Sequence, residues 1–192
     1  MILQLGSATS YAALRELTIA RATVADAADL ARAAAAMFEQ AFGDANSAED
    51  MAAYLSHAFS EDRQRNALED DRNLIWVARE PLRAAIAGYA HIRPGAPAGQ
   101  RIEAQRCAEI SRFYTDRAWH GRGLGPTLMN TCISAAAASG AGVLWLGVWE
   151  HNSRAIAFYE KHGFKTIGEQ QFMLGSDCQR DLVMALDLRG AR

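Results

Sequence analysis

Two stretches of the sequence decide the fold: EISRFYTDRAWHGRGLG at residues 109–125, and NSRAIAFYEKHGF at residues 152–164. The first reads as a strand that ends in a glycine-rich turn and leads into a helix. The second reads as a helix that its first residues can cap and that Gly163 can end. Between them, Val143–Trp149 is an apolar run of strand length. This order predicts two parallel strands joined by a crossover helix.

Outside these stretches the sequence continues to predict helices and strands around one core. Strands are expected at 17–21, 74–79, 85–93, 109–115, 143–149, 164–174 and 182–188, and helices at 27–42, 48–57, 61–69, 123–139 and 152–163. Antiparallel hairpins followed by a strand–helix–strand unit predict a mixed α/β sheet with helices on both faces. Residues 80–83 read as a turn and 94–99 as a loop. We expect residues 1–16 to be a lead-in and residues 17–190 to form a single domain.

Composition excludes several classes of protein. The 192 residues are half apolar, and the formal net charge of −2 gives no field that would attract nucleic acid or an anionic membrane. The three cysteines lie far apart without metal-ligand spacing, so neither a disulfide framework nor a zinc site is expected. The first residues lack the features of a signal peptide, and no stretch approaches the ~20 apolar residues of a membrane helix. We therefore expect a soluble, cytoplasmic protein with no metal and no nucleic-acid or membrane partner.

The turn from His120 to Gly125 is suited to binding an anion. Its backbone N–H groups converge at the positive end of a helix dipole, glycines let the backbone approach phosphate oxygens, and Arg122 adds a cation. The glycines alternate and do not follow G-x-G-x-x-G, which argues against a nucleotide-binding oxidoreductase. A helix start that only needs a tight turn would look the same, so the turn alone leaves its role open.

Taken together, the two stretches resemble the acyl-CoA site of the Gcn5-related N-acetyltransferase (GNAT) superfamily. The resemblance covers roughly residues 17–188. It implies the GNAT fold, a seven-stranded, mostly antiparallel sheet in which parallel strands four and five splay apart, and acetyl-CoA as the co-substrate. It also implies that the turn holds the pyrophosphate and that the pantetheine arm lies between the two strands. The acetyl-CoA-binding residues that it implies are Phe113, Tyr114, Thr115, His120, Gly121, Arg122, Gly123, Leu124, Gly125, Asn152 and Tyr159.

Two residues of the turn depart from the family pattern Gln/Arg-x-x-Gly-x-Gly/Ala. His120 occupies the first position of the pattern, and Pro126 follows the last glycine. Proline has no N–H, so one donor is lost, although the first turn of a helix tolerates proline well. The departures weaken the expected phosphate binding without abolishing it. They keep open a protein of another class, a sensor that binds acyl-CoA without turnover.

The same resemblance implies two catalytic residues. Tyr159 follows Asn152 by about two helical turns, so the two share a face, and it stands near the thioester sulfur. A phenol of pKa about 10 can protonate a departing thiolate of pKa about 8.5, which suits a general acid. Glu109 precedes His120 by the interval found in the histone-acetylating branch, and it can deprotonate an ammonium of pKa about 10.4. The alternatives are a core aromatic for Tyr159 and an ion pair with Arg112 or another basic residue for Glu109.

Residues 42–55, 146–150 and 168–175 are similar to the bacterial spermidine/spermine N-acetyltransferase group. This similarity implies direct transfer in a ternary complex to a primary amine, with a polyamine as the first candidate. A polyamine needs carboxylates, and the candidates are Glu49, Asp50, Glu150, Glu169 and Asp177. Each of these can also be a solvated surface charge. A protein or peptide N-terminus and an antibiotic amine are the alternative acceptors, and a homodimer stays an open expectation because exposed strand edges invite pairing.

Overall fold

The computed structural model describes residues 17–80, 85–97 and 107–189. The predicted lead-in at 1–16 lies outside these ranges, as do most of the predicted turn at 80–83 and part of the predicted loop at 94–99.

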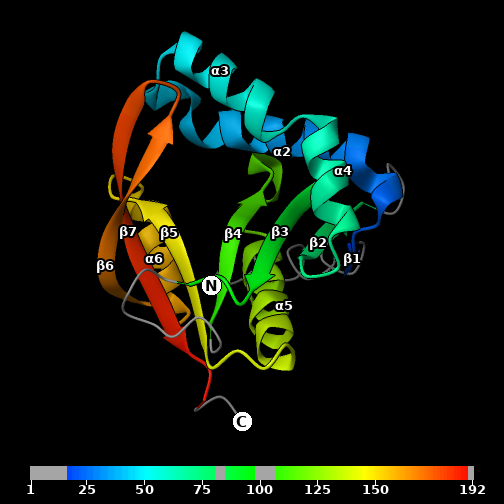
Figure 1. Ribbon diagram of the computed structural model, residues 1–192, viewed down its shortest axis with the longest axis vertical. Coiled ribbons are helices and arrows are strands. Elements are labelled where there is room, and N and C mark those ends of the chain that lie inside the picture. The colour runs from blue at the N-terminus through cyan, green and yellow to red at the C-terminus, as the bar shows by residue number, and fades with distance from the viewer. Residues whose placement is uncertain (1–16, 81–84, 98–106, 190–192) are drawn as a thin grey trace, which may run out of the picture.

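Seven strands form one sheet in the order β1-β2-β3-β4-β5-β7-β6 (Figure 1). The strands are β1 (Thr18–Arg21), β2 (Leu74–Arg79), β3 (Ile86–Pro94), β4 (Cys107–Thr115), β5 (Val143–Trp149), β6 (Lys165–Leu174) and β7 (Asp177–Asp187). Every neighbouring pair is antiparallel except β4 and β5, which are parallel. The predicted mixed α/β sheet is therefore confirmed.

Helices cover both faces of the sheet (Figure 1). They are α2 (Ala27–Phe42), α3 (Ala48–Ala58), α4 (Glu61–Glu69), α5 (Leu124–Ala138) and α6 (Ser153–Lys161), with short 3-10 turns η1 (Val24–Asp26), η2 (Gly43–Ala45) and η5 (Arg117–Trp119). We call the face covered by α2, α3 and α4 the α2 side, and the face covered by α5 and α6 the α6 side. Each side has its own buried apolar cluster. Among the described residues, no helix combines the length and apolar character that crossing a bilayer requires.

Two strands begin earlier than predicted. β4 begins at Cys107 rather than Glu109, and β7 begins at Asp177 rather than Leu182. In both cases pairing with a neighbouring strand extends the element beyond the apolar run that predicted it, since β3 pairs with Ala108 and β6 pairs with β7 as far as Asp177. The extension of β7 matters for function because it brings a polar part of the chain into the sheet.

The parallel pairing of β4 and β5 ends early. It joins only Cys107–Glu109 to Val143–Trp145. Beyond this point β4 keeps pairing with β3, and β5 keeps pairing with β7, to the end of each strand. The facing edges of Ile110–Thr115 and Leu146–Trp149 therefore lie apart, which leaves a gap in the middle of the sheet (Figure 1).

An irregularity in β4 accompanies this separation. His91 of β3 pairs with Arg112 and Ile92 pairs with Ile110, so Ser111 is an extra residue, a β-bulge, whose hydroxyl donates to the His91 carbonyl at 3.2 Å. A bulge bends its strand and shifts the alternation of side chains by one. Because cross-strand partners share a face, Glu109 lies on the same face as Arg112.

Candidate active site

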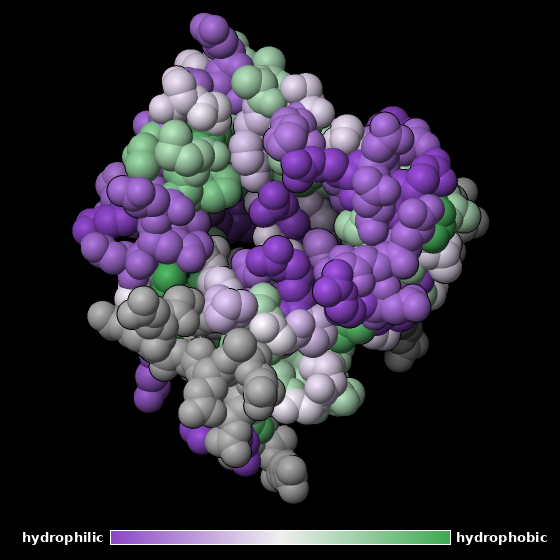
Figure 2. Space-filling model, viewed as in Figure 1, coloured by the Kyte–Doolittle hydropathy of each residue, from purple (hydrophilic) through white to green (hydrophobic). Residues whose placement is uncertain are grey.

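A cavity of about 800 Å³ occupies the gap between β4 and β5. Its walls include side chains from both faces of the sheet, so the cavity passes through the sheet from the α6 side to the α2 side. Figure 2, in the same view as Figure 1, shows a hollow near the middle of the molecule, among mostly hydrophilic side chains. The two sides offer different chemistry.

The glycine turn lines the cavity on the α6 side. Gly121 and Gly123 adopt left-handed backbone conformations, with φ of 74° and 88°, and Gly123 is the N-cap of α5. A residue other than glycine is strained at such angles. The first N–H groups of α5 have no intrahelical acceptor and carry the positive end of the helix dipole. The turn can thus present backbone donors to an anion in the cavity.

Most predicted binding residues lie where the sequence placed them. The lining includes Phe113, Tyr114, Thr115, His120, Gly121, Gly123, Gly125, Asn152 and Tyr159. Arg122 and Leu124 are not among the residues that line the cavity, and their predicted contact with the ligand, through the backbone of the turn, stays a prediction. The Arg122 guanidinium lies over the Trp119 ring, 5.6 Å from its centroid, and Leu124 is fully buried in a small apolar cluster with Ala78 and Ala87.

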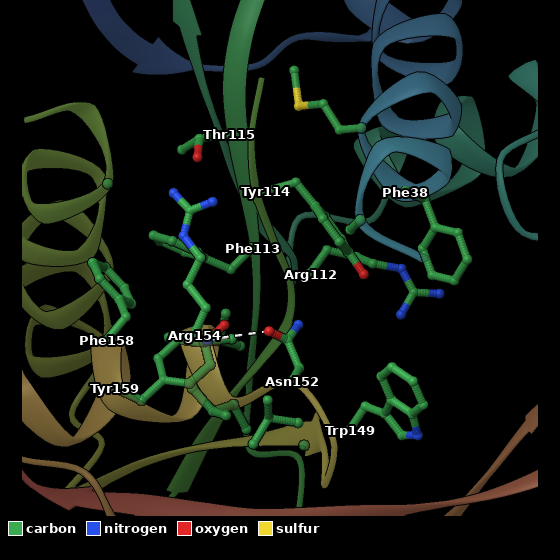
Figure 3. A pocket seen from close by; sticks show the side chains of 18 of the residues that line it. Phe38, Arg112, Phe113, Tyr114, Thr115, Trp149, Asn152, Arg154, Phe158 and Tyr159 are labelled. Carbon is green, nitrogen blue, oxygen red and sulfur yellow. Dashed lines mark hydrogen bonds between the residues drawn. The ribbon is translucent and has the colours of Figure 1, made fainter. Parts of the chain in front are cut away.

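Cations that the sequence reading missed line the cavity. Arg154 and Lys161 line it from α6, and Figure 3 shows Arg154 beside Phe113 and Thr115. Arg117 also lines the cavity, but its guanidinium donates to the Gln40 carbonyl of α2 at 2.5 Å. His120 has a structural role, since its Nε2 is 3.1 Å from the Thr115 carbonyl oxygen and so ties the turn to the end of β4. This side of the cavity therefore suits a ligand with several negative charges.

Tyr159 belongs both to the core and to the cavity wall. It is 8% exposed, and its ring lies 6.3 Å from that of Phe113 and 5.8 Å from that of Phe164. Burial raises the pKa of Tyr159 well above its ordinary value, so the phenol is neutral. No hydrogen bond to its hydroxyl is found in the part of the chain that the structure describes. The hydroxyl is thus a proton donor with no partner among the described residues, and Figure 3 shows the ring on the same side of β4 as Phe113.

Glu109 lines the cavity where β4 and β5 separate. Its Oε2 accepts hydrogen bonds from both Nε, at 2.8 Å, and Nη2 of Arg93. The ion pair considered from the sequence therefore exists, with Arg93 rather than Arg112 as the partner. Glu109 still reaches the cavity, but one of its oxygens is already engaged.

Asp181 is a cavity residue that the sequence reading missed. It is 8% exposed, and it lies on β7 between its cross-strand partners Trp149 and Gln170. Burial raises the pKa of Asp181 to about 6, and within the described ranges no hydrogen bond or ion pair reaches its carboxylate. The alternation of side chains along the strand could have indicated its burial, because Asp181 shares a strand face with the buried Val183.

Gly147 makes room for this carboxylate. A Cβ atom at Gly147 would lie 3.1 Å from Asp181 Oδ2 and 2.5 Å from Gln170 Nε2. The two polar side chains thus converge over the backbone of β5, and any larger residue would displace them.

Arg112 is the cation on the α2 side. Its guanidinium donates to the Ser111 carbonyl at 2.9 Å and to the Tyr54 hydroxyl at 3.0 Å, and it lies 5.5 Å from the centroid of the Phe59 ring. Figure 3 shows Arg112 and Tyr114 on the side of β4 that faces Phe38. No ion pair to Arg112 is present among the residues described.

The five carboxylates proposed for a polyamine lie outside the cavity wall. Glu150 and Glu169 both pair with Arg180, and Asp50 accepts a hydrogen bond from the Ser176 backbone at 2.7 Å. Asp177 accepts from Gln179, and Glu49 is exposed in the first turn of α3. The structure thus uses four of them in local contacts and gathers none at the cavity.

Comparison with known proteins gives a consistent result. The Acetyltransferase (GNAT) family profile matches residues 38–164. An uncharacterised N-acetyltransferase of Mycobacterium tuberculosis is 36% identical over 163 residues, which cover 85% of this chain and 98% of the relative. Another, from Lactobacillus delbrueckii subsp. lactis, is 31% identical over 147 residues, which cover 77% and 83% of the two chains.

Two solved structures share the fold at lower identity. The PaiA N-acetyltransferase of Thermoplasma acidophilum, in complex with coenzyme A, has a TM-score of 0.70 and 18% identity, and the alignment covers 89% of this chain and 98% of that one. YncA of Salmonella typhimurium, a putative acetyltransferase with its cofactor acetyl-CoA, has a TM-score of 0.65 and 21% identity, with 91% and 95% covered.

Proposed function

This chain belongs to the acetyltransferase (GNAT) family and is an N-acetyltransferase, and we propose that it moves the acetyl group of acetyl-CoA directly to a primary amine within the cavity. The observation that carries the proposal is the continuity of the cavity. It joins an anion-binding glycine turn on the α6 side to the buried carboxylate of Asp181 on the α2 side, through a gap in the sheet.

The α6 side fits coenzyme A. Its pyrophosphate matches the N–H groups at the start of α5 and the charges of Arg154 and Lys161. The unpaired edges of β4 and β5 offer backbone donors and acceptors to the amides of the pantetheine arm, as they would to an added strand. Pro126 removes only one donor, in the first turn of α5.

Tyr159 is suited to protonate the leaving group. In the transfer, the amine nitrogen forms a bond to the acetyl carbonyl carbon, and the carbon–sulfur bond breaks. The thiolate then takes the phenolic proton, and a backbone N–H of β4 near Phe113 polarises the carbonyl. The Tyr159 hydroxyl has no described protein partner that would compete for this proton.

The attacking ammonium must first lose a proton to a base. Glu109 and Asp181 are the carboxylates in the cavity wall. Glu109 shares one oxygen with Arg93, whereas Asp181 is unengaged and its pKa of about 6 places it close to operating pH. The proposal assigns the ammonium contact and its proton to Asp181, and it keeps Glu109 as the second candidate, acting through water.

Location and assembly belong to the proposal as well. The cysteines Cys107, Cys132 and Cys178 are all free, which suits a reducing cytoplasm. β6 is an edge strand of the sheet, and a homodimer through this edge would pair its backbone groups.

Assays on the purified protein test the proposed transfer as a whole. Calorimetry measures acetyl-CoA binding, and free-thiol release is followed with spermidine, spermine, an aminoglycoside, a short peptide and simple primary amines. Binding together with release on any of these amines supports the transfer and identifies the acceptor. Binding without release would favour a sensor, and the absence of binding would overturn the proposed site.

Replacing Tyr159 with phenylalanine tests the general acid. We expect Tyr159→Phe to lower kcat by ~10²-fold or more with nearly unchanged affinity for acetyl-CoA, because only the proton is lost. Tyr89→Phe is the control, since Tyr89 is a buried tyrosine that does not line the cavity. Equal kcat values for Tyr159→Phe and the wild type would mean that Tyr159 is only a core residue and not the general acid.

Replacing Gly123 with valine tests the turn. Gly123 and Gly140 have similar left-handed angles, with φ of 88° and 84°, at the two ends of α5, and only Gly123 lines the cavity. Gly123→Val and Gly140→Val should therefore cost similar strain, ~1–2 kcal/mol of stability. Only Gly123→Val should weaken acetyl-CoA binding, by ~10-fold or more, in calorimetry. Equal affinities in the two folded variants would remove the turn from the site.

The pH profile distinguishes the two candidate bases. A base must be ionised to accept a proton, so an Asp181 base predicts that kcat/KM falls as the pH drops through about 6. Asp181→Asn should lower kcat/KM by ~10²-fold or more and abolish this acidic limb, whereas Glu109→Gln should keep it. Asp177→Asn, on the same strand but outside the cavity wall, is the control. A limb that survives in Asp181→Asn and disappears in Glu109→Gln would assign the base to Glu109.

A further inference from the structure

The α2 side of the cavity carries two opposite charges that do not meet. Arg112 on β4 and Asp181 on β7 both line the cavity. Cross-strand pairing places both on the same face of the sheet, across the gap from one another. No ion pair joins them in the described part of the chain, although the charge of Glu109, on the same face, contributes to the raised pKa of Arg112.

The phenols of Tyr54 and Tyr114 lie near both charges. The Tyr54 hydroxyl accepts a hydrogen bond from Arg112 at 3.0 Å. Burial is the main cause of the raised pKa of both Tyr54 and Tyr114, while the charge of Arg112 opposes this rise and that of Asp181 adds to it. The charges of Arg112 and Asp181 therefore act on the same two hydroxyl groups. This indicates that Arg112 and Asp181 lie around the same part of the cavity.

Each charge has unused binding capacity. A guanidinium has five N–H donors, and the contacts of Arg112 with Ser111 and Tyr54 use two of them. Its planar fork matches the two oxygens of a carboxylate. The Asp181 carboxylate accepts no hydrogen bond from the described residues, and an ammonium supplies three donors. A buried charge without a partner is costly, which applies to Asp181 among the described residues, and a ligand that pairs with it while using the free donors of Arg112 would gain from both contacts.

We infer that the acceptor is an amino-carboxylate, a molecule whose ammonium group contacts Asp181 and whose carboxylate contacts Arg112. This inference rests on the proposed acetyl transfer and deepens it. A polyamine would instead place a second ammonium group near Arg112, where like charges repel. The five carboxylates proposed for a polyamine lie outside the cavity wall and do not offset this repulsion.

Matched pairs of acceptors test the inference by thiol release. Each pair consists of an amino acid and the amine that lacks only its carboxylate: L-leucine with 3-methylbutylamine, L-lysine with cadaverine, and 5-aminopentanoate with butylamine. The wild type should prefer the carboxylate-bearing member of at least one pair by ~10²-fold in kcat/KM, the scale of a charge-assisted hydrogen-bond pair.

Substitutions at Arg112 locate the origin of the preference. Arg112→Gln should lower kcat/KM for the carboxylate-bearing member, mainly through KM, by ~10²-fold more than it lowers kcat/KM for its amine partner. Arg112→Lys keeps a cation but not the planar guanidinium, so its kcat/KM for the carboxylate-bearing member should lie between those of the wild type and Arg112→Gln. Arg65→Gln is the control, because Arg65 is exposed on α4 and does not line the cavity. Thermal melting checks that each variant is folded. If Arg112→Gln does not fold, the preference of the wild type for carboxylate-bearing acceptors tests the inference.

The outcomes separate this inference from the proposed function. Release with polyamines or simple amines in preference to every carboxylate-bearing partner keeps the acetyl transfer and overturns the inference. Equal loss of activity toward both members of a pair in Arg112→Gln would show that Arg112 only supports the fold. Acetyl-CoA binding without release on any amine overturns the proposed transfer, and this inference with it.

Discussion

The early end of the pairing between β4 and β5 is the constraint on which the rest of the site depends. A sheet is stable because its backbone groups pair, and here Ile110–Thr115 and Leu146–Trp149 leave their facing edges unpaired. Each strand is held in place by its other neighbour, β3 or β7, and the bulge at Ser111 bends β4. The resulting opening is wide enough for a cavity and polar enough, along its backbone edges, to hold a ligand that pairs as a strand does.

Much of this arrangement is predictable from the sequence because it follows local rules. The glycine turn, the cap at Asn152 and the two helices beside the gap are set by residues close together in the chain. Tyr159 lines the cavity from α6, and Asn152 lines it from the N-cap of the same helix, where its side chain accepts from the Ala155 N–H. The guanidinium of Arg122 lies over Trp119, a contact that glycine spacing does not encode.

What the sequence could not reveal depends on the register between strands. Strict alternation would place Glu109 and Arg112 on opposite faces, and only the bulge brings them to the same one. Asp181 was missed because the apolar run begins at Leu182, whereas pairing with β6 extends β7 back to Asp177. The carboxylates that the sequence favoured are instead engaged locally, as when Arg180 pairs with Glu150 and Glu169. Burial and partner choice, not residue type, separate a binding carboxylate from a surface one.

The short parallel junction also has a mechanical consequence. Between Cys107–Glu109 and Val143–Trp145, three residue pairs are the backbone pairing that joins a four-stranded half of the sheet to a three-stranded half. Side chains join the halves on both faces, since the cluster on the α6 side spans them and the cluster on the α2 side includes Leu174 of β6. A molecule lying along both open edges would add a second set of backbone contacts between the halves. Slower hydrogen exchange in β4 and β5 would then report occupancy even when no chemistry follows.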